Sequence, residues 1–426
     1  MTAPTVRVGI VSAESLEISL GKGYTLDGEP VRGAVRLNVN AGKVVFAGRT
    51  YDKLYFAADD AVNDTFEVKD VVIGVDFHWE RKETQVFNGS AEIIVENGRL
   101  TLINIVPVEE YLKSVISSEM SSHACLEFLK AHAVISRSWL LAQLVKKNGR
   151  ASSCIRTDAE ITKWYDRDDH VNFDVCADDH CQRYQGRTRV ATETAVKAVE
   201  ETSGQVLLDN EGALCDTRFS KCCGGVFEEF ENCWEPVHHH YLEARADSPE
   251  HAHFPDLSIE ENARRWIMER PAAFCNTDAR EVLEQVLNNY DQETTDFYRW
   301  TVRYTADELS ELVSRRSGID FGTIESLEAL SRGTSGRITR LKITGSKCSF
   351  IVGKELEIRK WLSTSHLYSS AFIVEREGTD FVLHGAGWGH GVGLCQIGAA
   401  VMGTRGYSYQ AILDHYFPGA RLTKQY

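Results

Sequence analysis

Residues 1–105 constrain the fold most strongly, because they consist of short runs in which apolar residues alternate with polar ones or are β-branched. The runs are separated by Gly, Asn and Asp, which favour turns. They read VRVGIV, VRLNV, KVVFA, DVVIGVDFHW, AEIIVE and LTLINIV. A period of two is typical of strands with one buried face. We therefore predict that this part of the chain is a β-rich unit.

The rest of the chain is expected to be mixed. A length of 426 residues exceeds the usual size of one hydrophobic core, so two or more units are expected. After the β-rich unit of residues 1–105, we predict an α/β core over 106–245, a mainly helical middle segment over 246–334, and a C-terminal part over 335–426 that completes the core. The predicted fold class is α+β, with the β-rich unit packed on the core.

Charge and hydropathy argue against nucleic-acid binding and against a membrane-spanning helix. The net charge is −15, and no stripe of Lys and Arg is present to neutralise a phosphate backbone, which argues against nucleic acid. No segment approaches the ~20 consecutive apolar residues that a membrane-spanning helix needs. The N-terminus MTAPTVRVGI lacks both the basic and the apolar region of an export signal. The chain is therefore expected either to stay where it is made or to have lost its signal.

Glu119 lies on the apolar face of a predicted helix that Pro107 opens. At about 100° per residue it shares that face with five apolar residues, which are Val108, Tyr111, Leu112, Val115 and Ile116. A carboxylate held against apolar neighbours has a raised pKa and can serve as a general acid near neutral pH. The alternative is structural: Glu119 closes the helix, reaching solvent at its end or pairing with a buried cation.

Arg137 is a second polar residue on an apolar stripe, in a helix predicted for about residues 126–146. The connection between the two helices is short, so Arg137 and Glu119 could meet in the core. A guanidinium beside the carboxylate would lower its pKa and oppose the acid role. Two interpretations stay open: Arg137 forms a buried ion pair, or it binds substrate or a developing oxyanion.

The 11 cysteines are an odd number and gather in places, which favours metal ligation or free thiols over a regular disulfide framework. One group is Cys215, Cys222, Cys223 and Cys233. The other lies in VCADDHCQRYQG, where Cys176, His180 and Cys181 share one loop. Two sulfurs and an imidazole suit Zn²⁺, with the fourth position left for water, substrate or a distant ligand. The alternative is a pair of free thiols and a surface histidine.

The segment HGAGWGHGVGLCQIGA has glycine at every second position from 385 to 393. In an extended strand this period leaves one face without side chains, so that a ligand or another strand can approach closely. His390 and Gln396 add polar groups suited to a sugar or a peptide, although a purely structural strand would have the same pattern. The chain contains no GxGxxG, GxxxxGK[ST], HExxH or GxSxG motif, so nucleotide binding and serine hydrolysis have no support.

Five motifs occur in order along the chain: VPVEEYLKSVISSEM, LKAHAVISRSWLL, HCQRYQG, TSGQVLL followed by CCGGVFE, and GWGHGVGLCQIGA. Together they resemble the SpoIID/LytB family of sporulation peptidoglycan lytic transglycosylases and amidase enhancers. The resemblance covers roughly residues 100–245 and 335–420. It implies that Glu119 is the acid/base and that Cys176, His180 and Cys181 bind zinc. The chain departs from the family at Ser121, where proline is usual, and at Cys395, where serine is common.

The resemblance implies a lytic transglycosylase that cleaves between N-acetylmuramic acid and N-acetylglucosamine and leaves 1,6-anhydro ends. Its catalytic residue is Glu119, its zinc is expected to be structural, and its partners are peptidoglycan glycan strands and an N-acetylmuramoyl amidase. The expected substrate-binding residues are Arg137, Gln182, Tyr184, His390 and Gln396. The cell envelope is the expected location, with the cytoplasm as the alternative because no signal is present. The rival function is a non-catalytic glycan-binding amidase enhancer.

Overall fold

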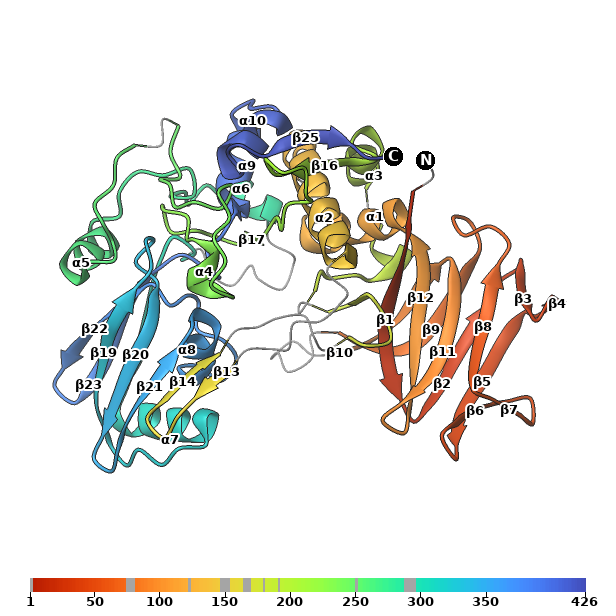
Figure 1. Cartoon of the computed structure of the whole chain (residues 1–426), viewed down its shortest axis with the longest axis horizontal. Coiled ribbons are helices and arrows are strands. Elements are labelled where there is room, and N and C mark those ends of the chain that lie inside the picture. Colours follow the sequence, from red (N-terminus) through yellow and green to blue (C-terminus); the bar gives the residue numbers. More distant parts are fainter. Residues whose placement is uncertain are drawn as a thin grey trace. The chain divides into compact units, whose positions relative to one another are not determined.

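The computed structural model divides the chain into two compact units (Figure 1). The first combines residues 1–147, 169–207 and 422–426, and the second combines 148–168 and 208–421. The residues described are 3–73, 81–121, 124–145, 154–163, 170–178, 181–190, 192–249, 252–286 and 296–426. Both units mix helices and strands, so the predicted α+β class is confirmed.

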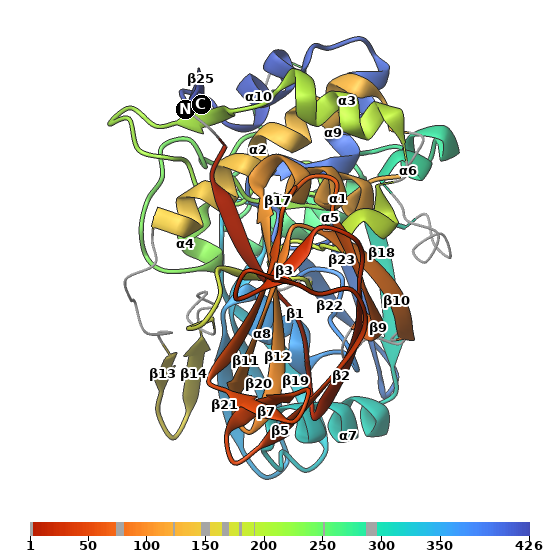
Figure 2. The same cartoon turned by 90° about the vertical axis from the view of Figure 1, so that its right-hand side faces the viewer.

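Two sheets that pack on each other form the body of the first unit (Figure 2). One has the strand order β15-β1-β12-β11-β8-β3-β4 and the other has the order β10-β9-β2-β5-β6-β7. The strands are β1 (Thr5–Ala13), β2 (Ser15–Leu20), β3 (Tyr24–Leu26), β4 (Glu29–Pro30), β5 (Gly33–Asn40), β6 (Lys43–Phe46), β7 (Arg49–Tyr51), β8 (Lys53–Ala58), β9 (Thr65–Ile73), β10 (Arg81–Asn88), β11 (Ser90–Glu96), β12 (Arg99–Pro107) and β15 (Val175–Cys176).

Aromatic pairs join the two sheets. Tyr24 meets Phe66 edge to face with ring centroids 6.2 Å apart, and Phe46 meets Phe56 in the same way at 5.9 Å. Along strands such as β2 and β8, buried positions alternate with more exposed ones, as the period of two in the sequence predicts. The β-rich character predicted for the N-terminal residues is therefore confirmed.

Helices at one end of these sheets complete the first unit (Figure 2). They are α1 (Val108–Glu119), α2 (Leu126–Val145), the 3₁₀ helix η1 (Gly186–Arg189) and α3 (Glu193–Glu201). Strands β16 (Gln205–Leu208) and β25 (Arg421–Lys424) pair beside them. The helix α2 contacts both α1 and α3 and is buried on nearly all sides, as its apolar residues predict. Among the described residues, no helix has the length and apolar character required to cross a bilayer.

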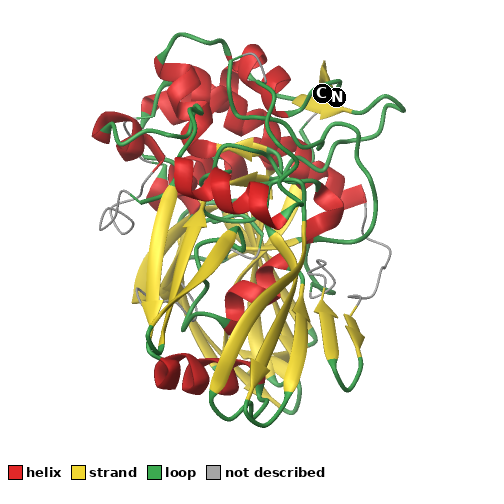
Figure 3. Ribbon diagram, turned by 90° about the vertical axis from the view of Figure 1, so that its left-hand side faces the viewer, coloured by secondary structure: helices red, strands yellow, loops and turns green. Residues whose placement is uncertain are grey.

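The second unit contains a five-stranded sheet of order β13-β14-β21-β20-β19, a three-stranded sheet of order β18-β23-β22, and the pair β17-β24. In Figure 3 its strands are yellow and its helices are red. Its strands are β13 (Cys154–Arg156), β14 (Glu160–Lys163), β17 (Phe219–Ser220), β18 (Arg299–Tyr304), β19 (Ile324–Arg332), β20 (Ile338–Gly345), β21 (Ser349–Gly353), β22 (Phe372–Glu377), β23 (Asp380–Ala386) and β24 (Leu394–Cys395). Its helices are α4 (Phe230–Cys233), α5 (Glu260–Glu269), α6 (Arg280–Val286), α7 (Ala306–Ser317), α8 (Glu355–Trp361), α9 (Gln396–Thr404) and α10 (Tyr409–Tyr416).

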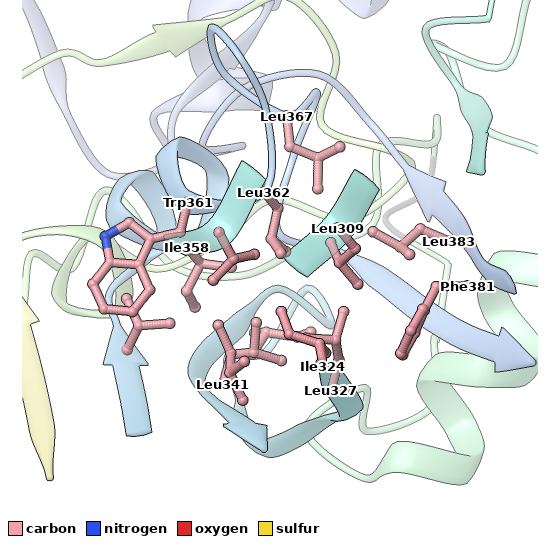
Figure 4. Packing of buried hydrophobic residues seen from close by; sticks show 14 of the residues in the cluster. Leu309, Ile324, Leu327, Leu341, Ile358, Trp361, Leu362, Leu367, Phe381 and Leu383 are labelled. Carbon is pink, nitrogen blue, oxygen red and sulfur yellow. The ribbon is translucent and has the colours of Figure 1, made fainter. Parts of the chain in front are cut away.

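A single apolar cluster joins the two larger sheets of this unit to α7 and α8 (Figure 4). Leu309 of α7 and Ile358 of α8 pack with Leu341 of β20, Ile324 of β19 and Leu383 of β23. The middle segment, predicted to be mainly helical, contains α5, α6 and α7 but also β18 and β19. Strand β18 pairs with β23, which lies far along the chain, whereas β19 forms a hairpin with the next strand, β20.

Candidate functional site

Glu119 is the last residue of α1. The five apolar residues that share its predicted face are completely buried, so the face itself is confirmed. Glu119 differs from them because it is partly exposed. Its Oε1 atom accepts the backbone N–H of Arg183 at 3.0 Å. The carboxylate therefore lies at the end of the helix, as in the structural interpretation, and it is held by a hydrogen bond on a residue that is partly exposed.

Arg137 pairs with Glu109 rather than with Glu119. Its Nε and Nη2 atoms donate to Oε1 and Oε2 of Glu109 at 2.9 and 2.6 Å, and its Nη1 atom donates to the carbonyl of Gln205 at 3.1 Å. The arginine side chain is 0% exposed. Oε1 of Glu109 also accepts the backbone N–H of Gly204 and the hydroxyl of Tyr426. This is a buried structural ion pair, and the predicted meeting of Arg137 with Glu119 in the core does not occur.

His170, Cys176 and Cys181 form a group whose ligand atoms all lie within 4.8 Å of one another. The Nε2 atom of His170 is 3.4 Å from the sulfur of Cys181, which also accepts the N–H of Cys176 at 3.4 Å. The neighbouring Cys181 thiol, and then burial, raise the pKa of Cys176. A cation between the sulfurs would reverse this effect. The group is therefore suited to a metal ion and includes two of the three predicted ligands, while His180 lies outside the described residues.

The edge of the larger sheet positions this group. Strand β15 runs parallel to β1 and pairs Cys176 with Gly9. Just before it, the carboxylate of Asp174 accepts the N–H of Arg7 at 2.9 Å. The ring of Phe173 packs on the imidazole of His170, with centroids 4.7 Å apart, and lies so close to Gly9 that a Cβ there would be 2.6 Å from the ring. A side chain at Gly9 would therefore displace the residues that bring His170 to the cysteines.

His170 was not among the ligands predicted from the sequence. It precedes Cys176 by six positions, so that the ligands read His-x5-Cys-x4-Cys. His180 was predicted instead because it is adjacent to Cys181 in the sequence. A search for histidines on both sides of the cysteine pair would have included both candidates, since zinc sites commonly combine ligands from separate segments.

The residues that follow Cys181 are held by contacts with β12, α1 and α2. Tyr184 is 1% exposed, and its hydroxyl donates to Oδ1 of Asn104 at 2.6 Å while its ring stacks on Tyr111. Burial raises the pKa of Tyr184, so the hydroxyl keeps its proton. Gln182 is also 1% exposed and donates to the carbonyl of Ser136 at 3.3 Å. These anchors hold the intervening Arg183 N–H against Glu119, so the metal-binding group and the carboxylate belong to one continuous arrangement.

A small pocket lies next to this arrangement. It is bordered by β1, the end of β9, and residues 176–178 and 183–185. Cys176 and Arg183 both line it, whereas Glu119 is not among its described lining residues. The pocket is therefore adjacent to the metal-binding group and to the residue whose N–H binds Glu119.

The glycine-rich segment is not the extended strand that its period predicted. Strand β23 ends at Ala386, and Gly387, Gly389, Gly391 and Gly393 all have φ between +71° and +94°. Such angles suit glycine because it has no Cβ. The segment curls around the guanidinium of Arg337, which donates to the carbonyl of Gly389, and a Cβ on Gly391 would be 2.4 Å from its Cζ. The expected close approach of backbone is present, but it is to the protein's own side chains.

His390 and Gln396 belong to the second unit, whereas Glu119, Arg137, Gln182 and Tyr184 belong to the first. His390 is half-buried, and its Nδ1 atom accepts the N–H of Val392 at 3.0 Å. Burial, and then the nearby Arg218, lower the pKa of His390 well below its usual range. Gln396 begins α9 and is 3% exposed. Of the five predicted substrate-binding residues, His390 is therefore the one with appreciable exposure.

Two family models match separate parts of the chain. Residues 96–208 match the family described as Stage II sporulation protein, SpoIID. Residues 228–393 match a domain of unknown function, DUF8618. The first match contains Glu119 and the group of His170, Cys176 and Cys181, and the second lies wholly within the second unit.

Three curated relatives align with most of this chain. An uncharacterized protein of Brachyspira hyodysenteriae is 23% identical over 78% of this chain and 71% of its own length. The amidase enhancer of Bacillus subtilis is 25% identical over 73% of this chain, although the match covers 40% of that protein. Stage II sporulation protein D of Bacillus subtilis is 22% identical over 75% of each chain. The resemblance that the ordered motifs indicated is confirmed by these matches.

Proposed function

We propose that this chain, whose residues 96–208 match the SpoIID family, is a peptidoglycan lytic transglycosylase with Glu119 as its single acid/base. The supporting observation is the position of Glu119 within that domain. The carboxylate is partly exposed at a helix end and held by the N–H of Arg183. A general acid must be both fixed and reachable by substrate, and this residue meets both conditions.

In the proposed reaction, Glu119 donates its proton to the oxygen that links N-acetylmuramic acid to N-acetylglucosamine, and the bond from C1 to that oxygen breaks. The C6 hydroxyl of the muramic residue then attacks C1, and its proton passes to the Glu119 carboxylate. The products are a 1,6-anhydro end and a free 4-hydroxyl. Glycosidases that use water normally need two carboxylates. Here the C6 hydroxyl of the same sugar takes the place of the water and of the second carboxylate, because it is already close to C1.

The other predicted residues receive different roles in this proposal. Arg137, Gln182 and Tyr184 are buried, so they hold the surroundings of Glu119 and do not contact the glycan. His390 is proposed as a glycan contact of the second unit, because it is the least buried of the predicted residues and its lowered pKa keeps the imidazole neutral. Gln396 is buried at the start of α9 and is assigned a structural role.

Zn²⁺ is the proposed occupant of the group formed by His170, Cys176 and Cys181. Two thiolates and an imidazole match the preference of this ion, and His180 is the proposed fourth ligand. The role is structural, because Glu119 supplies the proton chemistry and the group borders the residues that fix its carboxylate.

Digestion of purified sacculi tests the activity. The full chain is incubated with sacculi and with glycan stripped of stem peptides, and mass spectrometry identifies the released ends. Anhydro ends, one water lighter than hydrolysis products, are expected. Reducing N-acetylmuramic acid ends would show a hydrolase and contradict the proposal. Comparison of the two substrates shows whether stem peptides must first be removed.

The second candidate is a glycan-binding protein that stimulates an N-acetylmuramoyl amidase. The similarity to the amidase enhancer of Bacillus subtilis favours it, although only part of that protein is matched. Under this alternative the glycan stays intact in the sacculus assay, while the chain sediments with the sacculi and raises the rate of an added amidase. Either candidate acts on the cell wall, so the cell envelope is the proposed location.

Replacing His170 by alanine tests the metal-binding group. We expect zinc to be held at least ~10- to 100-fold more weakly, the range seen when even outer partners of a metal site are lost. Release to a chromophoric chelator measures the affinity. His253→Ala is the matched control, because His253 is exposed in the second unit and outside the group. Equal release rates from the two variants would exclude His170 as a ligand.

A further inference from the structure

A second group of possible metal ligands lies in the interior of the second unit. Cys223, Asp247, Cys275 and Cys395 are all buried, and their ligand atoms lie within 4.8 Å of one another. They come from four separate segments: the residues after β17, the residue after the bridge at Ala246, the loop between α5 and α6, and the end of β24. All four ligands belong to the second unit, so this group is distinct from the one around His170.

The distances suit one small ion. The sulfur of Cys223 is 3.5 Å from the sulfur of Cys275 and 3.5 Å from Oδ2 of Asp247. Zn–S bonds of about 2.3 Å place two sulfurs of a tetrahedral site about 3.8 Å apart. A disulfide would need the two sulfurs at about 2.05 Å. The usual iron–sulfur clusters are held by four cysteine thiolates, whereas this group offers three thiols and a carboxylate.

The orientation of Asp247 is the most informative detail. Its Oδ1 atom accepts the hydroxyl of Tyr416 at 3.0 Å and lies 3.3 Å from Nε2 of His415. Its Oδ2 atom accepts the N–H of Cys275 at 3.2 Å and is turned toward the sulfurs. Among the described residues, the one side chain that could pair with this completely buried carboxylate as a cation is His415, and it lies against Oδ1, so Oδ2 faces the sulfurs without one. A buried carboxylate needs either a paired cation or a metal ion.

Backbone N–H groups point at the sulfurs in the way that outer partners support metal thiolates. Cys395 accepts the N–H of Cys223 at 3.3 Å and that of Gly398 at 3.5 Å, and Cys223 accepts the N–H of Gly225 at 3.4 Å. Cys395 also precedes α9, whose N-terminal end favours a thiolate. These donors would stabilise negative charge on two of the three sulfurs.

The packing around the group leaves no room for a side chain at Gly398. Gly398 lies against the ligands, and a Cβ there would be 2.3 Å from the hydroxyl of Tyr416 and 2.6 Å from Oδ2 of Asp247. Helices α9 and α10, which carry Gly398 and Tyr416, lie side by side (Figure 1). The four ligands are therefore buried and packed against residues of these two helices.

We propose that Cys223, Asp247, Cys275 and Cys395 bind a structural zinc ion within the second unit. Three thiolates and one carboxylate complete a tetrahedral site, and a site with four protein ligands has no position for catalysis. The ion joins four segments that are 24 to 172 residues apart in sequence, so it stabilises the unit that carries the glycine-rich segment. This inference does not depend on the proposed transglycosylase activity.

Metal analysis of the full chain tests the proposal. The wild-type protein is expected to retain two zinc ions per chain after gel filtration, and Cys275→Ser is expected to halve this content. Cys233→Ser is the matched control, because Cys233 is buried in the same unit and donates to the carbonyl of His390, which a serine hydroxyl can also do. Unchanged zinc in Cys275→Ser would overturn the proposal.

A second measurement remains informative if Cys275→Ser does not fold. His170→Ala leaves the second group intact, so it should still hold one zinc ion per chain; complete loss of zinc from this variant would contradict the proposal. In the wild-type chain, Cys223, Cys275 and Cys395 should resist alkylation until a chelator is added. A disulfide between Cys223 and Cys275 would resist both before and after the chelator, and peptide mapping would then reject the metal site.

Discussion

Replacing Glu119 by glutamine is expected to reduce the release of anhydro-muropeptides from sacculi by about 10²- to 10⁴-fold, the contribution of a positioned acid/base. Glutamine has nearly the same shape, and its carbonyl oxygen can still accept the N–H of Arg183. The amide cannot donate a proton to the leaving oxygen or remove one from the C6 hydroxyl. The rate should therefore fall while the fold and the binding of glycan remain.

The control for this variant is Glu193→Gln. Glu193 is an exposed glutamate in the first turn of α3, within the same unit, so the chemical change is identical and the location differs. Product release is followed by mass spectrometry, and glycan binding is followed by sedimentation with sacculi. If Glu119→Gln released products as fast as Glu193→Gln, Glu119 would not be the acid/base. If it lost sedimentation as well, its role would lie in binding.

Replacing Arg137 by methionine is expected to destabilise the first unit by about 3–5 kcal/mol, the usual result of removing one partner of a buried ion pair. The change leaves the largely buried carboxylate of Glu109 with only the Gly204 N–H and the Tyr426 hydroxyl as partners. It also leaves the carbonyl of Gln205 without the donor that Arg137 supplied. Hydrogen exchange of peptides from α1 and α2 measures the effect in this unit alone.

Two further variants make the test specific. Arg340→Met removes an exposed pair with Glu160 in the second unit and should cost only about 0–1 kcal/mol. Adding Glu109→Gln to Arg137→Met should recover part of the lost stability, because no unpaired charge then remains. Similar losses for Arg137→Met and Arg340→Met would show that the buried pair contributes no more than a surface pair.

The sequence predicted those features that depend on near neighbours along the chain. The period of two gave the strands of the N-terminal sheets, and the period of 3.6 gave α1 and α2 to within one or two residues. Helix α9 was not predicted, because QIGAAVMGT is buried on nearly all sides and has no polar face to reveal a helical period. The glycine-rich segment was misinterpreted for a similar reason, since regular spacing does not distinguish a bare strand from repeated left-handed turns.

The same difference between local and long-range features applies to the residues of the candidate site. The order of the motifs was sufficient to indicate the family and to single out Glu119, Cys176 and Cys181. The partners of these residues could not be predicted from the motifs, because a hydrogen bond or a metal site depends on which segments meet in space. Glu109 paired with Arg137 although Glu119 lies on the same helix, since the turn at Gly204 and Gln205 packs beside Glu109.

By itself the sequence determined the α+β class, the strands and helices with a clear local period, and the motif set of the family. Only the tertiary structure decided which histidine approaches Cys176 and Cys181, and that Asp247 meets three cysteines from distant segments. The physical reason is that local periodicity records which face of an element is buried, whereas ligand groups arise from close packing between elements far apart in the chain.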